Sequence, residues 1–306
     1  MNWQEVLHLL LISQVNLLVD AYFTKDFNKW LMEFYGPNTQ ATLNRADLGY
    51  AGSFGGKQYQ NEMLRKQPVI FVHGVSNRAG DQPLLGAMHF RYSGYNWSEL
   101  YATTYASGNQ GNPLQWTQYS MKCQYVKQVR ALIVAVRLYT GRAVDVIAFS
   151  LGVPIARKAV LGGDCVDTAE YLGRPLTHFV DTFVGIAGPN HGVSHQALFI
   201  GHLSIPSCIH GLLPICNTGD GLYSGACPVE SAFLTNINSQ QDYEGKHIFS
   251  IYSKADQWVG YNVCNKITAQ IPGQHGEKVY DAKNHDETFE DSVEVQRQMI
   301  LNHIVI

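Results

Sequence analysis

Apolar and polar positions follow two recurring patterns along the chain, and both become regular after position 67. Four largely apolar runs, at 69–72, 144–149, 179–187 and 248–253, have the length and composition of strands buried on both faces of a sheet. The segments between them include stretches with apolar residues at helical spacing. Strands that alternate with helices predict an α/β fold: a mostly parallel, doubly wound sheet with helices on both faces.

The helical pattern is clearest in two segments. Between 119 and 139 the apolar positions recur every three or four residues, and Gly141 stands where a helix commonly ends. Aromatic and apolar residues from 23 to 34 show the same spacing, with Thr24 as the expected N-cap and Gly36 beyond the last turn. Each segment is therefore predicted to form an amphipathic helix.

Two regions show neither pattern. The stretch after the first helix, up to residue 66, is rich in glycine and polar side chains, so we expect a surface arm without chemistry of its own. Residues 80–118 are expected to form a loop whose many aromatic rings line an acyl pocket or simply pack together. The main domain is therefore expected to begin at 67.

Ser150 directly follows the apolar run 144–149 and precedes another helical segment. The residues two positions before and after it, Ala148 and Gly152, are both small. A nucleophilic serine on a sharp strand-to-helix turn needs small residues there because the backbone is crowded. Pro154 fits this arrangement, since proline is tolerated in the first turn of a helix. The pattern also fits an ordinary serine after a buried strand. Whether Ser150 is a nucleophile therefore depends on whether the chain also supplies a base and an acid for it.

A serine nucleophile needs a histidine to accept its proton and an acid to orient that histidine. In the chain order Ser, acid, His, each residue lies on a loop at the same edge of a parallel sheet. Asp256 follows the last of the four apolar runs, and His285 lies in the last loop before a predicted C-terminal helix. Asp220 and Asp242 are competing acids. We predict Ser150 as nucleophile, Asp256 as acid and His285 as base.

The first predicted strand ends in His73 and Gly74. A glycine here lets the backbone turn so that the amide of Val75 points at a reacting carbonyl, as half of an oxyanion hole. A His-Gly pair after a strand is weak evidence alone. It gains meaning because this strand precedes the serine segment.

The composition restricts the classes of protein to which the chain can belong. The chain has 306 residues, 45% apolar and 15% charged, which suits one large α/β domain. The net charge of -3 and the absence of Lys/Arg runs argue against a nucleic-acid partner. The apolar run 6–19 is too short to span a membrane and fits a signal peptide cleaved after Ala21. An amphipathic N-terminal helix is the alternative.

The cysteine content fits a secreted chain. The even number of cysteines suggests up to three disulfides, and the sequence leaves their pairing open: Cys123, Cys165, Cys208, Cys216, Cys227 and Cys264. Asn96 begins an N-x-S sequon, which matters only if the chain enters the secretory pathway. His191 and His195 have a spacing that could hold zinc, but Gly192 favours a loop and no carboxylate completes the set, so no metal is expected.

Five segments together resemble the class 2 triacylglycerol lipase family: PVIFVHG (68–74), VDVIAFSLG (144–152), FVGIAGPNHG (183–192), YSKADQWVG (252–260) and KNHDETF (283–289). The resemblance runs from about residue 68 to the C-terminus. It implies an α/β-hydrolase fold, a secreted protein and hydrolysis of carboxylic esters without an organic cofactor. It also implies a triad of Ser150, Asp256 and His285, with the amides of Val75 and Leu151 as the oxyanion hole. Two of the segments show a fainter similarity to extracellular polyhydroxybutyrate depolymerases.

The chain is thus predicted to comprise a signal peptide at 1–21, an N-terminal helix and glycine-rich arm at 22–66, and an α/β-hydrolase domain at 67–306. Residues 188–238 are expected to form a cap over the acyl site or, equally, a buried structural subdomain. The predicted function is a secreted triacylglycerol lipase that meets ester lipids at a lipid–water interface. Polyester depolymerase, phospholipase and catalytically silent lipid-binding protein remain alternatives, and the oligomeric state stays open.

Overall fold

The computed structural model describes residues 22–109, 116–193, 199–200, 203–204, 208, 213–223, 227 and 229–306. The predicted signal peptide, residues 1–21, lies outside these ranges and is not tested by the structure. Across the described ranges, no helix combines the length and apolar character needed to cross a membrane.

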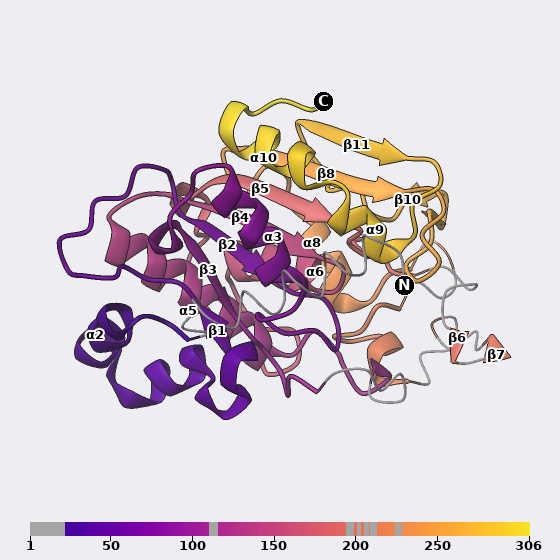
Figure 1. The fold of residues 1–306 in the computed structure, drawn as a ribbon. Helices are drawn as coiled ribbons and strands as arrows, with labels where there is room; N and C mark the ends of the chain where they lie inside the picture. The colour runs from indigo at the N-terminus through magenta and orange to yellow at the C-terminus, as the bar shows by residue number, and fades with distance from the viewer. Residues whose placement is uncertain are drawn as a thin grey trace.

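A seven-stranded sheet runs through the centre of the described part of the chain (Figure 1). Its order is β1-β3-β2-β4-β5-β8-β11, and all neighbouring strands are parallel except β1 and β3. The strands are β1 (Ser53–Phe54), β2 (Val69–Val72), β3 (Leu100–Thr103), β4 (Val144–Phe149), β5 (Val180–Ile186), β8 (His247–Ser253) and β11 (Gly276–Tyr280). The four predicted strands are all present to within one residue, and the expected fold class is confirmed.

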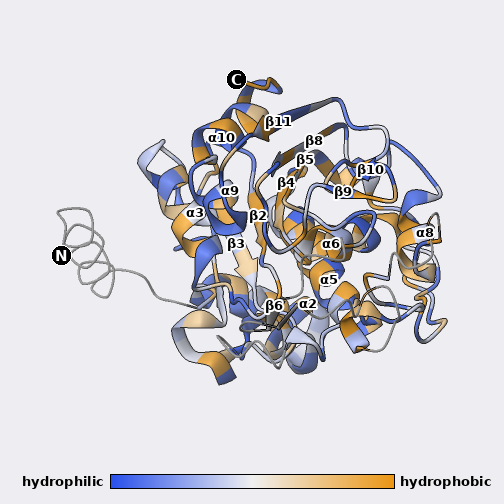
Figure 2. Cartoon of the chain, turned by 90° about the vertical axis from the view of Figure 1, so that its right-hand side faces the viewer, coloured by the Kyte–Doolittle hydropathy of each residue, from blue (hydrophilic) through white to orange (hydrophobic). Residues whose placement is uncertain are grey.

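Helices cover both faces of the sheet. The first layer contains α2 (Lys25–Asn44), α5 (Cys123–Thr140), α6 (Gly152–Leu161) and α8 (Ala232–Asn238), and the second contains α3 (Gln82–Tyr92), α9 (His285–Glu290) and α10 (Val293–Asn302). Val146 and Ala148 of β4 belong to the first core, whereas Ile147 and Phe149 belong to the second. The central strands are largely apolar because both faces are buried, as Figure 2 shows.

Shorter elements complete the described structure. They are 3₁₀ helices at Ala46–Ala51, Trp97–Glu99, Thr177–Phe179 and Pro214–Cys216, and the antiparallel pairs β6 (Phe199–Ile200) with β7 (Leu203–Ser204) and β9 (Asn262–Val263) with β10 (Lys266–Ile267).

The predicted loop at 80–118 is wrong, because its described part contains α3 and β3. Pro83 and Gly86 obscure the helical pattern in the sequence. Pro83 lies in the first turn, where its missing N–H has no helical partner to lose. Gly86 allows close packing, since a Cβ there would lie 3.2 Å from the rings of both Phe71 and Phe289.

The glycine-rich arm also differs from its prediction, because it supplies one edge of the sheet. Its β1 pairs with β3, and Phe23 forms a bridge with Gly55. A Cβ at Gly55 would lie 2.3 Å from the Leu100 carbonyl oxygen, so the close approach of arm and sheet requires glycine. The segment before residue 67 is therefore continuous with the sheet.

α2 begins as predicted and extends beyond its predicted end. The Thr24 hydroxyl accepts a hydrogen bond from the Phe27 amide at 3.3 Å, which confirms the N-cap. The backbone leaves the helical conformation at Gly36, with φ 79° and ψ 172°. Pro37 then starts a second helical segment, because its fixed φ suits a first turn. The glycine thus kinks α2 instead of ending it.

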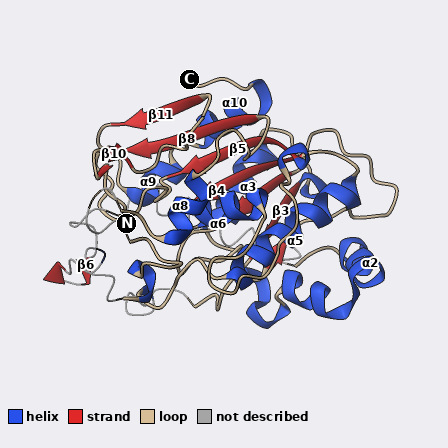
Figure 3. Cartoon of the chain, turned by 180° about the vertical axis from the view of Figure 1, so that it is seen from behind, coloured by secondary structure: helices blue, strands red, loops and turns tan. Residues whose placement is uncertain are grey.

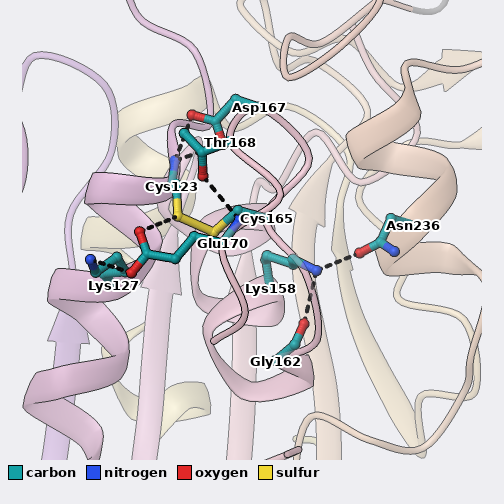
Figure 4. The surroundings of a disulfide bond; sticks show 9 residues. All are labelled: Cys123, Lys127, Lys158, Gly162, Cys165, Asp167, Thr168, Glu170 and Asn236. Atoms are coloured by element: carbon teal, nitrogen blue, oxygen red, sulfur yellow. Dashed lines mark hydrogen bonds and ion pairs between the residues drawn. A yellow bond between two sulfur atoms is a disulfide. The ribbon is translucent and has the colours of Figure 1, made fainter. Parts of the chain in front are cut away.

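The six cysteines form three disulfides, the number that the even count suggested. One ties the start of α5 to the loop after α6, where the Asp167 carboxylate accepts a hydrogen bond from the Cys123 amide (Figure 4). The pairs are Cys123–Cys165, Cys208–Cys216 and Cys227–Cys264. Each cross-link stabilises the fold chiefly by restricting the unfolded chain.

The segment 188–238 was predicted as a cap or, equally, as a buried structural subdomain, and many of its residues lie outside the described ranges. Its C-terminal part, α8, packs Phe233 and Leu234 into the same core as α6. The buried Lys158 ammonium of α6 also donates to Asn236 of α8 at 2.7 Å (Figure 4). α8 is therefore part of the domain core.

Asp145 is a buried carboxyl in the middle of the sheet, at an irregularity between β4 and β5. The register between the two strands shifts by one residue there, and Asp145 Oδ1 accepts hydrogen bonds from the Thr182 amide (3.1 Å) and from Gln67 Nε2 (2.8 Å). Burial, with a further contribution from the nearby Asp181 carboxylate, raises the pKa of Asp145 to about 8. The folded protein therefore holds this carboxyl protonated at neutral pH.

Asp145→Asn is expected to stabilise the protein more at alkaline than at acid pH. Between its unfolded pKa near 3.8 and the folded value of about 8, the unfolded chain releases the proton that the folded chain keeps, so wild-type stability falls as pH rises. The gain from asparagine should be larger at pH 8.5 than at pH 5, by up to about 4 kcal/mol. Urea unfolding at both pH values measures it. The exposed Asp281→Asn is the control, and an equal effect of Asp145→Asn at both pH values would contradict the assignment.

Candidate active site

Ser150 occupies the turn between β4 and α6 in a left-handed backbone conformation, with φ 52°. Such a φ is uncommon outside glycine and persists only where the surroundings enforce it. The Ser150 amide donates to the Ile186 carbonyl at the end of β5 (2.8 Å), and the Ser150 carbonyl accepts from the Val153 amide in α6 (2.9 Å). These two bonds hold the serine between strand and helix.

The small residues around Ser150 are required by close backbone contacts. A Cβ at Gly152 would lie 2.3 Å from the His73 carbonyl oxygen, and a Cβ at Gly74 would lie 3.0 Å from the Ser150 Cβ. Ala148 is fully buried, so the methyl group at this position fits the core. The end of β2 therefore lies directly against the serine turn.

Asp256 and His285 are brought together at the same edge of the sheet. His285 Nδ1 and Asp256 Oδ2 are 2.6 Å apart, and both residues are buried, at 6% and 7% exposure. A carboxylate in this position accepts the proton of Nδ1, which leaves the lone pair of a neutral ring on Nε2. The structure thus sets the tautomer that a general base needs.

The Asp256 carboxylate is fixed from its other side by the turn that follows it. Asp256 Oδ1 accepts hydrogen bonds from the amides of Trp258 and Val259, both at 2.9 Å. The His285 amide in turn donates to Gln257 Oε1 at 3.0 Å. The turn 256–259 therefore positions acid and histidine together. An aspartate on the loop after an apolar strand was the sequence signal for this arrangement, but the roles of its neighbours were not predicted.

His285 was predicted in a loop, whereas the structure places it as the first residue of α9. Asn284 is the N-cap, and Glu287 completes a capping box with it. The His285 ring packs on Phe149, the residue before Ser150, with ring centroids 4.8 Å apart. The histidine ring and the serine turn are therefore neighbours.

The competing acids lie elsewhere. Asp220 is bonded to the Ser120 hydroxyl (2.6 Å) and to Asn217 (2.7 Å). Asp242 lines a surface cavity formed by the starts of strands, away from the ends that carry Asp256 and His285. No hydrogen bond or ion pair joins either aspartate to a histidine in the described structure.

His73 supports the backbone that carries the predicted oxyanion amide of Val75. Its Nε2 accepts the Tyr105 amide (3.1 Å), so Nδ1 donates to the Gly74 carbonyl (2.7 Å), and the Tyr105 hydroxyl donates to the His73 carbonyl (3.0 Å). The two rings stack at 4.0 Å. Burial lowers the pKa of His73 to about 4, which keeps the ring neutral. Leu151, the other predicted oxyanion residue, is the N-cap of α6 directly after Ser150. Tyr105 was expected only as one of the aromatic residues of 80–118, and its hydrogen bonds with His73 were not predicted.

Of the two histidines considered as zinc ligands, the structure describes only His191. His191 Nδ1 contacts the Glu230 carboxylate at 2.8 Å, which is an ion pair or hydrogen bond between side chains. Hydrogen bonds from His191, Lys266 and Asn238 outweigh burial and lower the pKa of Glu230 to about 2. His195 lies outside the described residues, so the zinc alternative is not tested.

A serine on the turn after a central parallel strand, with helices on both faces of the sheet, defines the α/β-hydrolase fold. Two solved structures share this fold at low identity. Bacillus licheniformis lipase BlEst2 in mature form is 15% identical with a TM-score of 0.52, over 83% of this chain and 98% of the other. Aspergillus fumigatus lipase B is 15% identical with a TM-score of 0.51, over 76% of this chain and 48% of the other. The chain thus spans about half the length of the fungal lipase structure.

The family model described as Lipase (class 2) matches residues 66–298, which is most of the chain. The chain belongs to this family, and the resemblance drawn from the five sequence segments is confirmed. Family and fold together make it an ester hydrolase of the serine type. No curated protein sequence matches the chain.

Proposed function

We propose that the protein hydrolyses ester lipids, with triacylglycerols as its main substrates, through a triad of Ser150, Asp256 and His285. The observation that carries this proposal is the buried hydrogen bond between Asp256 and His285, with the His285 ring against the residue that precedes Ser150. The left-handed turn at Ser150 supports the same role, because strained backbone is concentrated at functional sites.

In the proposed mechanism, His285 Nε2 takes the Ser150 proton while Oγ forms a bond to the ester carbonyl carbon. Asp256 holds the ring in the required tautomer and stabilises its protonated form. The protonated ring then gives its proton to the departing alcohol as the bond between carbonyl carbon and alkoxy oxygen breaks. Water, activated by the same histidine, hydrolyses the acyl-enzyme and releases the acid.

The negative charge that develops on the carbonyl oxygen would be met by the amides of Val75 and Leu151. Comparable donors contribute about 3 kcal/mol each to stabilisation of the transition state. The His73 and Tyr105 contacts support this role, because they hold the chain on either side of Gly74 before substrate arrives. The donors are therefore preorganised.

Labelling with a fluorophosphonate, followed by peptide mass mapping, tests the nucleophile. We expect one label, on Ser150. Turnover of p-nitrophenyl esters of increasing chain length and of emulsified triacylglycerol, phospholipid and polyhydroxybutyrate then defines the substrate. Triacylglycerol should be cleaved best. Preference for phospholipid or polyester would favour those alternatives, and a folded protein that takes no label would favour a silent lipid-binding protein.

We further propose that the protein is secreted, with 1–21 as its signal peptide. Three disulfides support an oxidising compartment. Asn96 is partly exposed, as glycosylation requires, although its side chain also caps the 3₁₀ helix that follows. The same mass mapping, applied to protein from culture medium, should find an N-terminus at Tyr22 and a glycan on Asn96; an intact N-terminus would contradict the proposal.

A further inference from the structure

Three side chains that commonly ligate metals lie close together at the end of the sheet where its parallel strands begin. Ser150 lies at the other end, where these strands stop. Asp181 lies near the start of β5, His247 is the first residue of β8, and His303 directly follows α10. β4, β5 and β8 run parallel, so their starts lie at the opposite end of the sheet from the active-site turns (Figure 3). At about 3.3 Å per residue, strands of this length separate the two ends by about 20 Å. The cluster is therefore separate from the candidate active site.

The ligand atoms of this cluster lie at distances suited to one ion. One nitrogen or oxygen from each side chain falls within 4.8 Å of the others, and His303 Nε2 is 3.2 Å from Asp181 Oδ2. Two ligands of a tetrahedral ion with bonds of about 2.0–2.1 Å are separated by about 3.3 Å. The rings of His247 and His303 stack at 3.7 Å, so one ring has to turn about its Cβ–Cγ bond for both lone pairs to converge.

His247 provides a second, independent observation. Its Nε2 is buried and has no hydrogen-bond partner in the described structure, although buried polar atoms normally have one. A bound cation would satisfy this nitrogen.

The surroundings allow an ion to enter. Asp181 lines a cavity of about 540 Å³ together with Lys246 and His275. Lys246 is exposed, and its Nζ lies 4.0 Å from Asp181 Oδ1, so it competes weakly for the carboxylate. His275 Nδ1 accepts the Ile248 amide at 3.0 Å and is occupied. One of the three proposed ligands, the Asp181 carboxylate, thus borders space that water can occupy.

We propose that Asp181, His247 and His303 form a binding site for a zinc-like divalent cation. Two imidazoles and one carboxylate suit Zn²⁺, whereas Ca²⁺ and Mg²⁺ prefer oxygen ligands alone. The ion ties the chain after α10 to the starts of β5 and β8, across sequence separations of up to 122 residues. Because α9 and α10 follow one another, it also anchors the segment that begins with His285.

Titration of Zn²⁺ into the full chain with its disulfides intact tests the site. Calorimetry should show one equivalent bound, and Zn²⁺ at about 100 times its Kd should raise the Tm by about 4–5 °C. Co²⁺ should give a visible absorption band from nitrogen and oxygen ligation. His303→Phe keeps the ring stack but removes the ligand nitrogen, and Asp181→Asn removes the carboxylate. Each should weaken binding at least about 30-fold.

The matched control is His89→Phe, because His89 is an exposed histidine on α3. This variant should bind Zn²⁺ as the wild type does. Absence of binding to the wild type, or binding that is undiminished in both His303→Phe and Asp181→Asn, would overturn the proposal. Ester hydrolysis is measured separately, so failure of the metal site is distinguishable from failure of the proposed function.

Discussion

Ser150→Ala should reduce kcat for ester hydrolysis by about 10⁴–10⁶-fold, because no other group then forms the acyl-enzyme. The fold should persist. Alanine keeps the Cβ that fits against Gly74 and accepts the same backbone conformation, so the free energy of unfolding should change by less than about 1 kcal/mol. Kinetics on a soluble p-nitrophenyl ester, with thermal unfolding of the same sample, measure both effects.

A matched serine variant separates the role of Ser150 from a general loss of a hydroxyl. Ser239→Ala removes an exposed hydroxyl that donates to the Asn236 carbonyl at 2.7 Å, far along the chain from the serine turn. It should leave kcat and KM unchanged. If Ser150→Ala kept more than one per cent of wild-type kcat in a folded protein, Ser150 could not be the nucleophile.

Asp256→Asn should reduce kcat by about 10³–10⁴-fold with little change in KM. The asparagine oxygen can still accept from the Trp258 and Val259 amides, so its amide nitrogen faces His285 Nδ1. That nitrogen donates a proton, which forces His285 into the tautomer protonated on Nε2. A ring in this form cannot accept the Ser150 proton. Steady-state kinetics near neutral pH measure the loss.

Asp286→Asn is the control for Asp256→Asn. Asp286 is the neighbour of His285 in α9, and its carboxylate accepts from Gln82 Nε2 at the surface (2.9 Å). This substitution should change kcat less than about 3-fold. Equal losses in the two variants would show that charge near His285 matters in general and would remove the specific role of Asp256.

Much of the candidate site follows from the order of residues along the chain. Ser150 after an apolar strand, Asp256 after a later strand and His285 near the C-terminus are local features, and parallel strands carry such turns to one edge. The choice of Asp256 over Asp220 and Asp242 was uncertain from sequence. The choice depends on which carboxylate forms a hydrogen bond with His285. Folding brings Asp256 and His285 together across 29 residues.

The supporting residues of the site could not be predicted, because each acts through a contact between distant segments. The Tyr105 amide donates a hydrogen bond to His73, which lies 32 residues earlier in the chain. The Phe149 ring in β4 packs against the His285 ring in α9. No periodicity marks such residues, since any buried aromatic would give the same pattern. Gln257 is local to Asp256, yet its contact with the His285 amide also requires the fold.

The sequence alone determined the parallel core, since strands buried on both faces are largely apolar, and it determined α5 through its apolar spacing and terminal glycine. It also determined the serine turn, where crowding demands Ala148 and Gly152. Only the tertiary structure decided the rest. Part of the glycine-rich arm forms β1 because it pairs with β3. α3 forms despite Pro83 and Gly86 because one of its faces is buried, and the pairing of the six cysteines also depends on the fold. The fold also gathered Asp181, His247 and His303 at the far edge of the sheet. These features depend on contacts between residues that are distant in the chain, and local sequence patterns do not predict such contacts.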